Sequence, residues 1–243
     1  MRFYLQKDYI CNMNKNVLFI FLLLITLSCF SQEEKVVDST KIDTRYREDQ
    51  FYVSVTYNLL NNKPSGMSQS GFSSGFHLGF IRDMPINDKR NLAIGIGLGL
   101  SSNSYNQNML IEKDDSNNLN YSPIEGAFSK NKFTTYVVEA PLEFRWRTST
   151  AADYTFWRVY TGVKFGYVVA NSSKYKGDLG TIKSTAIDDI EKLRYGLTLS
   201  LGYSTWNFHV YYGLNPIFKN SAKLNGESID TSSIKIGLMF YIL

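Results

Sequence analysis

The side chains of this sequence that could do chemistry are a set of acids and bases and two histidines. Glu143, Arg145 and Arg147 stand two positions apart, which in an extended chain directs all three to one face. Opposite charges on one face of neighbouring strands can pair across the sheet. We expect an ion-paired filling of a protein interior, with a narrow polar path or a docking site for a partner segment as sharper alternatives. The full set is Glu139, Glu143, Arg145, Arg147, Arg158, Lys164, Arg194 and Lys235, together with His77 and His209.

Signatures of catalysis are thin. Neither an HExxH motif nor a phosphate-binding P-loop occurs. His77 with Ser73 could imitate the pair of a lipid-acting hydrolase, but this spacing is generic. The acidic pairs Asp114–Asp115 and Asp188–Asp189 could bind calcium, although such pairs are more often only solvated. We therefore expect no enzyme, no metal site, no cofactor and no small-molecule substrate, and we interpret the histidines as hydrogen-bonding interior residues.

A period of two runs through the chain from residue 50 onward and predicts the strands that position these side chains. In NLAIGIGLGL, Asn91–Leu100, leucine and isoleucine form one face, and alanine and three glycines form the other. In a helix, each glycine would cost about 1 kcal/mol relative to alanine. The same alternation recurs in eight segments, residues 50–60, 71–81, 91–100, 134–147, 156–170, 193–204, 208–215 and 233–243.

One face of every predicted strand is strongly apolar, and the other holds glycine, serine and charge. A water-soluble barrel of eight strands is too narrow to enclose so many aromatic and leucine side chains. The inverted arrangement, with lipid outside and charge inside, is typical of outer-membrane barrels. We therefore predict an all-β fold, an eight-stranded antiparallel transmembrane β-barrel in the cell outer membrane, with lipid as a partner. A periplasmic β-sandwich is the rival interpretation.

The N-terminal segment predicts export. Val17–Leu27 is an apolar run behind Lys15 that is too short to span a bilayer, and it is followed by small residues, as in a signal peptide. We assign residues 1–31 to the signal peptide, with Met13 as an alternative start, residues 32–49 to a polar periplasmic leader and residues 50–243 to the barrel. Cys29 lies in a poor lipoprotein box, so its lipidation stays an open alternative.

The connections between predicted strands alternate between short and long, as in barrels with short periplasmic turns and longer extracellular loops. The two longest expected loops cover residues 104–132 and 171–192. The formal net charge is +4, and no dense basic patch stands out along the sequence, so we do not expect a nucleic-acid partner.

Four stretches narrow the interpretation further. GFHLGFIRDMPIN, RNLAIGIGLGLSSNSYNQN, EAPLEFRWRTST and FWRVYTGVKFGY resemble the PorT family, outer-membrane barrel proteins of the type IX secretion system. The resemblance implies a non-enzymatic component needed for cargo export, and possible involvement in gliding, with other type IX components as partners. It brings no catalytic residues. The alternative is a general small outer-membrane barrel with a passive structural, adhesion or minor porin role.

Overall fold

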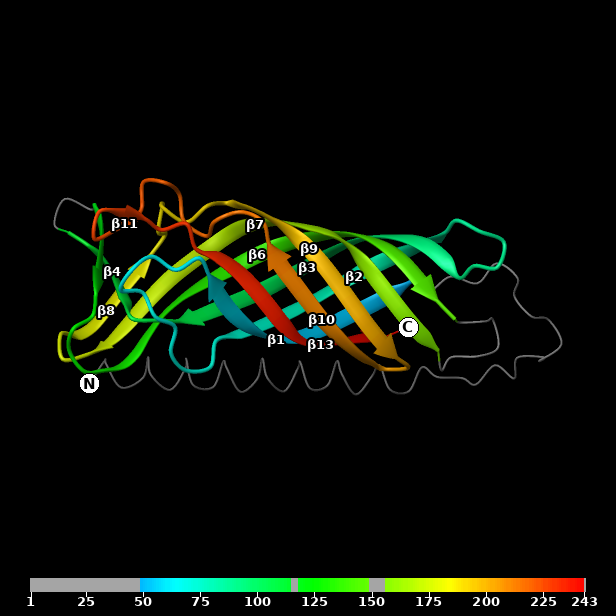
Figure 1. Cartoon of the computed structure of the whole chain (residues 1–243), viewed down its shortest axis with the longest axis horizontal. Helices are drawn as coiled ribbons and strands as arrows, with labels where there is room; N and C mark the ends of the chain where they lie inside the picture. Colours follow the sequence, from blue (N-terminus) through cyan, green and yellow to red (C-terminus); the bar gives the residue numbers. More distant parts are fainter. Residues whose placement is uncertain (1–48, 115–117, 149–155, 243) are drawn as a thin grey trace, which may run out of the picture. The chain divides into compact units, whose positions relative to one another are not determined.

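The computed structural model describes residues 49–114, 118–148 and 156–242. The predicted signal peptide, residues 32–48 of the leader, Cys29 and Asp115 lie outside these ranges. Within them, no helix is long and apolar enough to cross a membrane. Eight of the described strands form a closed antiparallel barrel (Figure 1). They are β1 (Gln50–Asn61), β2 (Ser74–Pro85), β3 (Leu92–Asn106), β6 (Phe128–Arg147), β7 (Trp157–Gly177), β9 (Leu193–Tyr203), β10 (Trp206–Gly213) and β13 (Ser232–Ile242).

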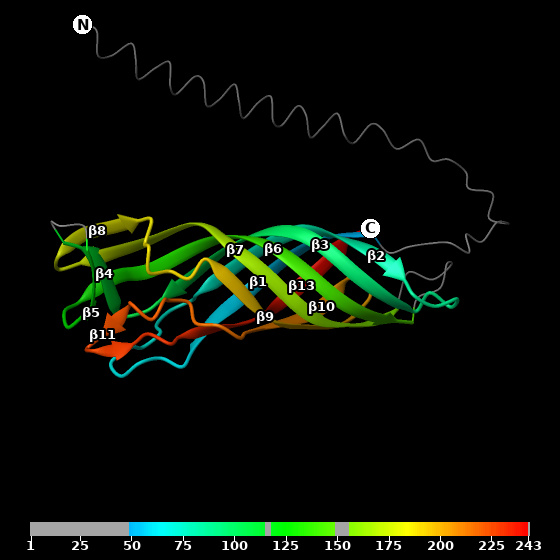
Figure 2. The same ribbon diagram turned by 90° about the horizontal axis from the view of Figure 1, so that it is seen from above.

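The barrel is a continuous meander in which each strand pairs with its neighbours in the chain. Its closure comes from β1 and β13, which pair from Phe51↔Ile242 to Asn61↔Ser232. The β2–β3 and β9–β10 connections and the paired ends of β6 and β7 at Arg147↔Arg158 lie at one end, called here the turn end (Figure 2). The four longer connections lie at the opposite loop end. The predicted eight-stranded antiparallel barrel is therefore confirmed.

The face that each strand turns outward is the apolar one. On β3 the exposed side chains include Ile96, Leu98 and Leu100, with Leu98 at 66% exposure. The intervening glycines face the interior, where space is scarce: a Cβ on Gly99 would lie 2.1 Å from the Tyr52 hydroxyl. The alternation in NLAIGIGLGL thus separates an outer apolar surface from an inner face that leaves room for larger neighbours.

The loop end is more structured than the sequence predicts. β3, β6 and β7 extend into the segments expected to be open loops, and β6 and β7 stay paired as far as Phe128↔Gly177. The β6–β7 pairing shifts register between Tyr136 and Val137, and beyond this point the outward-facing and inward-facing positions of β7 are exchanged. A search for residues alternating with a period of two therefore does not detect the extended part of the strand. Further short strands complete this end: β4 (Met109–Lys113), β5 (Leu119–Pro123), β8 (Gly180–Thr185), β11 (Lys223–Leu224) and β12 (Glu227–Ser228).

A hydrophobic core fills the loop end. Phe133 packs against Tyr105 with ring centroids 4.9 Å apart and against Phe218 at 5.3 Å. The Tyr121 hydroxyl donates to Asp189 at 3.0 Å, and burial, followed by the Asp189 charge, raises the pKa of Tyr121. The remaining buried members of this core are Leu60, Met67, Met109, Ile111, Val137, Val168, Ile187, Ile190, Ile217, Ala222, Leu224 and Ile229.

Candidate functional site: the charged interior of the barrel

An ion network occupies the turn end of the interior. Arg147 donates from both terminal nitrogens to the two oxygens of Asp83, each at 2.8 Å. Arg145 lies 3.2 Å from the same carboxylate and donates from Nε to Glu143 at 3.0 Å. Asp83 and both arginines are fully buried. A bidentate arginine–carboxylate pair fixes direction as well as distance, so this network holds β2 and β6 in one arrangement.

Aromatic side chains cover the network. The guanidinium of Arg145 lies 4.5 Å from the ring centre of Tyr160, and that of Arg158 lies 4.4 Å from the ring centre of Phe156. Tyr241 lies within 6 Å of both guanidinium groups. These contacts fill the turn end of the interior with large buried side chains.

A second charged group surrounds Glu139 halfway along the interior. Its Oε1 accepts a hydrogen bond from Ser101 at 2.7 Å and lies 3.2 Å from Nδ1 of His77. Its Oε2 lies 3.2 Å from the Lys164 ammonium. The other ring nitrogen of His77 contacts the Thr56 hydroxyl at 3.3 Å. Each charge is therefore paired within a buried polar network, as burial requires.

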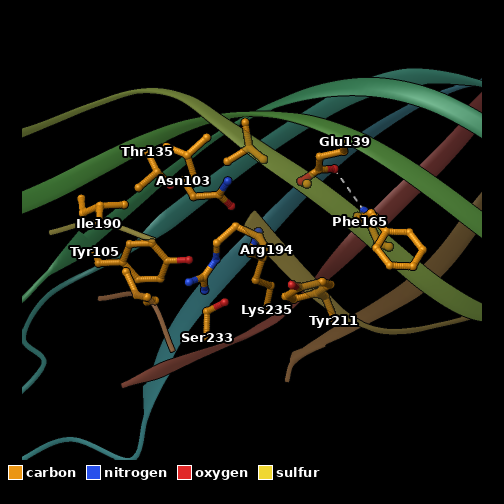
Figure 3. A pocket seen from close by; sticks show the side chains of 15 residues that line it. Asn103, Tyr105, Thr135, Glu139, Phe165, Ile190, Arg194, Tyr211, Ser233 and Lys235 are labelled. Atoms are coloured by element: carbon orange, nitrogen blue, oxygen red, sulfur yellow. Dashed lines mark ion pairs between the residues drawn. The ribbon is translucent and has the colours of Figure 1, made fainter. Parts of the chain in front are cut away.

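A small cavity lies between the two ends (Figure 3). Its volume is about 20 Å³, and Glu139, Arg194, Tyr211 and Lys235 are among the side chains around it. Arg194 donates to the carbonyl of Pro216, and the Lys235 ammonium lies 4.7 Å from the Tyr211 ring centre. This space holds about one water molecule. A cavity of this size does not admit solutes much larger than water.

The structure places all ten side chains singled out in the sequence inside the barrel, nine of them buried and Arg194 partly exposed. It separates them into the turn-end group and the group around Glu139. His209 stands apart and hydrogen-bonds Ser200 at 2.7 Å. The sequence analysis missed Asp83, although this residue is in phase with the inward residues of β2. The side chain of Ile81, two residues before Asp83, also points inward and interrupts the polar face. The predicted strand ended at Ile81, so Asp83 was not included in it.

The structure also bears on catalysis. Residues 71–75, GFSSG, match the letters of a GxSxG nucleophile motif, which the sequence analysis overlooked. They enter β2 from a loop instead of forming a strand-to-helix turn. The Ser73 hydroxyl accepts hydrogen bonds from Gln69 and from the backbone N–H of Asn106, at 2.9 Å each. Among the described residues, no group of three or more His, Cys, Asp or Glu could hold a metal ion.

Comparison with known proteins places this architecture in a family. No curated protein matches the chain in sequence. Among solved structures, it is similar to Ail, the attachment invasion locus protein of Yersinia pestis, crystallised with the heparin analogue sucrose octasulfate. The identity is 12%, the TM-score is 0.32, and the match covers 80% of this chain and 98% of Ail. The model of the outer membrane protein beta-barrel domain family matches residues 30–219. The chain therefore belongs to the outer membrane protein beta-barrel domain family and is a transmembrane β-barrel of the outer membrane.

Proposed function

We propose that this protein is a non-enzymatic, PorT-type component of the type IX secretion machinery, needed for the export of cargo proteins across the outer membrane. The observation that carries the proposal is where the PorT-like stretches lie. They form nearly all of β2 and β3 and the turn-end halves of β6 and β7, four neighbouring strands of the barrel. The same strands supply Asp83, Glu139, Glu143, Arg145 and Arg147.

The energetic cost of the turn-end ion network, formed by Asp83, Glu143, Arg145 and Arg147, supports more than a passive role. Burying ions costs several kcal/mol each, and well-packed apolar side chains often replace a buried ion pair without loss of stability. A barrel that only filled its interior could do so with apolar residues. The network lies at the turn end, which faces the periplasm in barrels of this kind. We propose that it fixes the shape of that end for contact with other secretion components.

The sealed interior favours a role carried out at the protein's surfaces. A cavity of about 20 Å³ does not suit a minor porin. The buried Ser200–His209 contact and the occupied Ser73 hydroxyl do not suit a lipid-acting enzyme, because neither offers a substrate an open nucleophile. If Ser73→Ala and His77→Gln variants alter the lipids of the cell envelope, the non-enzymatic proposal is wrong.

The deciding experiment is a clean deletion in a bacterium that carries this gene and the type IX system. Cargo would then be located in the medium, on the surface and in the periplasm. We expect cargo to be trapped inside and to be released again by a plasmid copy. Glu143→Gln and Arg145→Lys variants that still insert as folded barrels are expected to secrete less, whereas Glu125→Gln, at an exposed position in the β5–β6 connection of the loop end, is the matched control. Normal secretion without the gene would leave the passive structural or adhesion role.

A further inference from the structure

Five lysines gather on one face of the three-stranded ribbon that β6, β7 and β8 form at the loop end. They come from distant parts of the sequence, and cross-strand register brings them together. Lys130 is opposite Lys176, and Lys132 is opposite Lys174, which in turn is opposite Lys183. The set, called here the lysine face, is Lys130, Lys132, Lys174, Lys176 and Lys183.

The lysine face continues the outer, apolar surface of the barrel. The alternate residues of the ribbon point the other way, since Tyr175 is buried and Ser173 donates to the carbonyl of Ile111 in the loop-end core. Along β6, Lys132 shares a side with Tyr136, which is 47% exposed and is the last exposed apolar residue of that strand. The lysines therefore begin where the apolar band ends, at the level expected for lipid headgroups.

Among the described residues, no carboxylate forms an ion pair with this face. None of the five lysines takes part in an ion pair among the described residues. Like charges directly opposite each other on neighbouring strands are destabilising. An external anion would relieve that repulsion, and lysine ammonium groups are common ligands of phosphate.

A groove of about 510 Å³ lies directly beside the lysine face. It opens where β7 changes partners: pairing with β9 ends at Tyr167↔Leu193, and pairing with β8 begins at Ser172↔Thr185. The residues that line the groove include apolar Val169 and Ala170 and polar or charged Ser172, Thr185, Lys192 and Asp188. The groove thus spans the border between the apolar band and the cationic ribbon.

We propose that the lysine face and this groove bind a phosphorylated lipid of the outer leaflet. The lysines contact its phosphates, and the groove takes the part of the molecule where headgroup meets acyl chain. Lysine suits this position because its aliphatic stem can lie along apolar surface while the ammonium group reaches the polar layer. Continuity with the apolar band favours a lipid over a soluble polyanion, which would have no need of the groove.

The test uses the full chain in phosphatidylcholine nanodiscs, with bisphosphorylated lipid A as the probe and its dephosphorylated form for comparison. Binding is measured by native mass spectrometry. The variant Lys174→Gln/Lys176→Gln/Lys183→Gln is compared with Lys63→Gln/Lys219→Gln/Lys223→Gln, which removes the same charge from the other loops. We expect about a fivefold loss of affinity per lysine of the lysine face, from about 1 kcal/mol for each cation near an anionic surface. The control should retain wild-type affinity.

A second variant tests the groove separately. Ala170→Trp fills the groove without changing charge, and we expect it to weaken lipid A binding severalfold while leaving the barrel folded, as judged by its heat-modifiable mobility. Equal affinity of the two triple variants, or no preference for the phosphorylated lipid, would overturn the proposal. Binding of a single-stranded oligonucleotide that depends on the lysine face, but not on the groove, with no binding of lipid A, would assign the face to a soluble polyanion instead.

Discussion

At the scale of single residues, Asp83 holds the turn end of the barrel together, because it is the shared acceptor of Arg145 and Arg147. Asp83→Asn would remove the carboxylate that Arg147 contacts through both of its terminal nitrogens. We expect the free energy of unfolding to fall by about 3–5 kcal/mol, the usual cost of breaking a buried pair. Denaturant titration in lipid vesicles, read by the mobility difference between folded and unfolded forms, would measure it.

Two further variants separate charge from packing. Asp88→Asn changes an exposed aspartate five residues further on, in the β2–β3 turn, and should alter stability by less than about 0.5 kcal/mol. Asp83→Leu with Arg147→Met removes both charges and leaves Arg145 its contact with Glu143, so it should recover part of the loss. A double variant as unstable as Asp83→Asn would show that the side-chain shapes, and not the charges, matter.

At the scale of strands, Gly162 of β7 lies directly against the backbone of β6. A Cβ added there would lie 2.0 Å from the carbonyl oxygen of Leu142 and 2.8 Å from the Cα of Glu143, both backbone atoms of the opposite strand. We expect Gly162→Ala to destabilise the barrel by about 1–3 kcal/mol, as overpacking does. Thermal unfolding in detergent would measure this. Gly126→Ala, which meets only the Asp178 side chain, is the control and should lie close to wild type.

The loop-end core is a second element whose stability can be tested apart from the barrel. Phe218 is almost fully buried between Phe133 and Tyr121, so Phe218→Ala should loosen the core. Because exposed Lys219 and Lys223 flank this position, trypsin should then cleave the β10–β13 loop faster, with the membrane-embedded strands left intact. Leu179→Ala, at an exposed tip, should leave the cleavage rate unchanged. An unchanged rate for Phe218→Ala would mean that the core does not order this loop.

The strand scale also shows what the sequence could and could not predict. The eight strands and the inward direction of Arg145 or Lys164 follow from a period of two, because one face of every strand must be apolar. The loop-end core does not follow, because its members come from the ends of several strands and from several connections that only the fold brings together. The lysine face could not be predicted from the sequence either. Lys130 and Lys176 are far apart in the chain, and only the register of β6 and β7 makes them neighbours.

At the scale of the whole molecule, the barrel is sealed twice. The ion network and its aromatic cover fill the turn end, the apolar core covers the loop end, and the cavity beside Glu139 and Lys235 has a volume of about 20 Å³. We therefore expect the full chain to produce no stable conductance steps in planar bilayers. Arg145→Ala with Arg147→Ala would widen the turn end, yet conductance should stay absent because the loop-end core is untouched. Adding Phe133→Ala and Phe218→Ala should produce steps if the variant still shows the mobility of a folded barrel. Regular steps from the wild-type protein would contradict the double seal and would return the function to diffusion of small solutes.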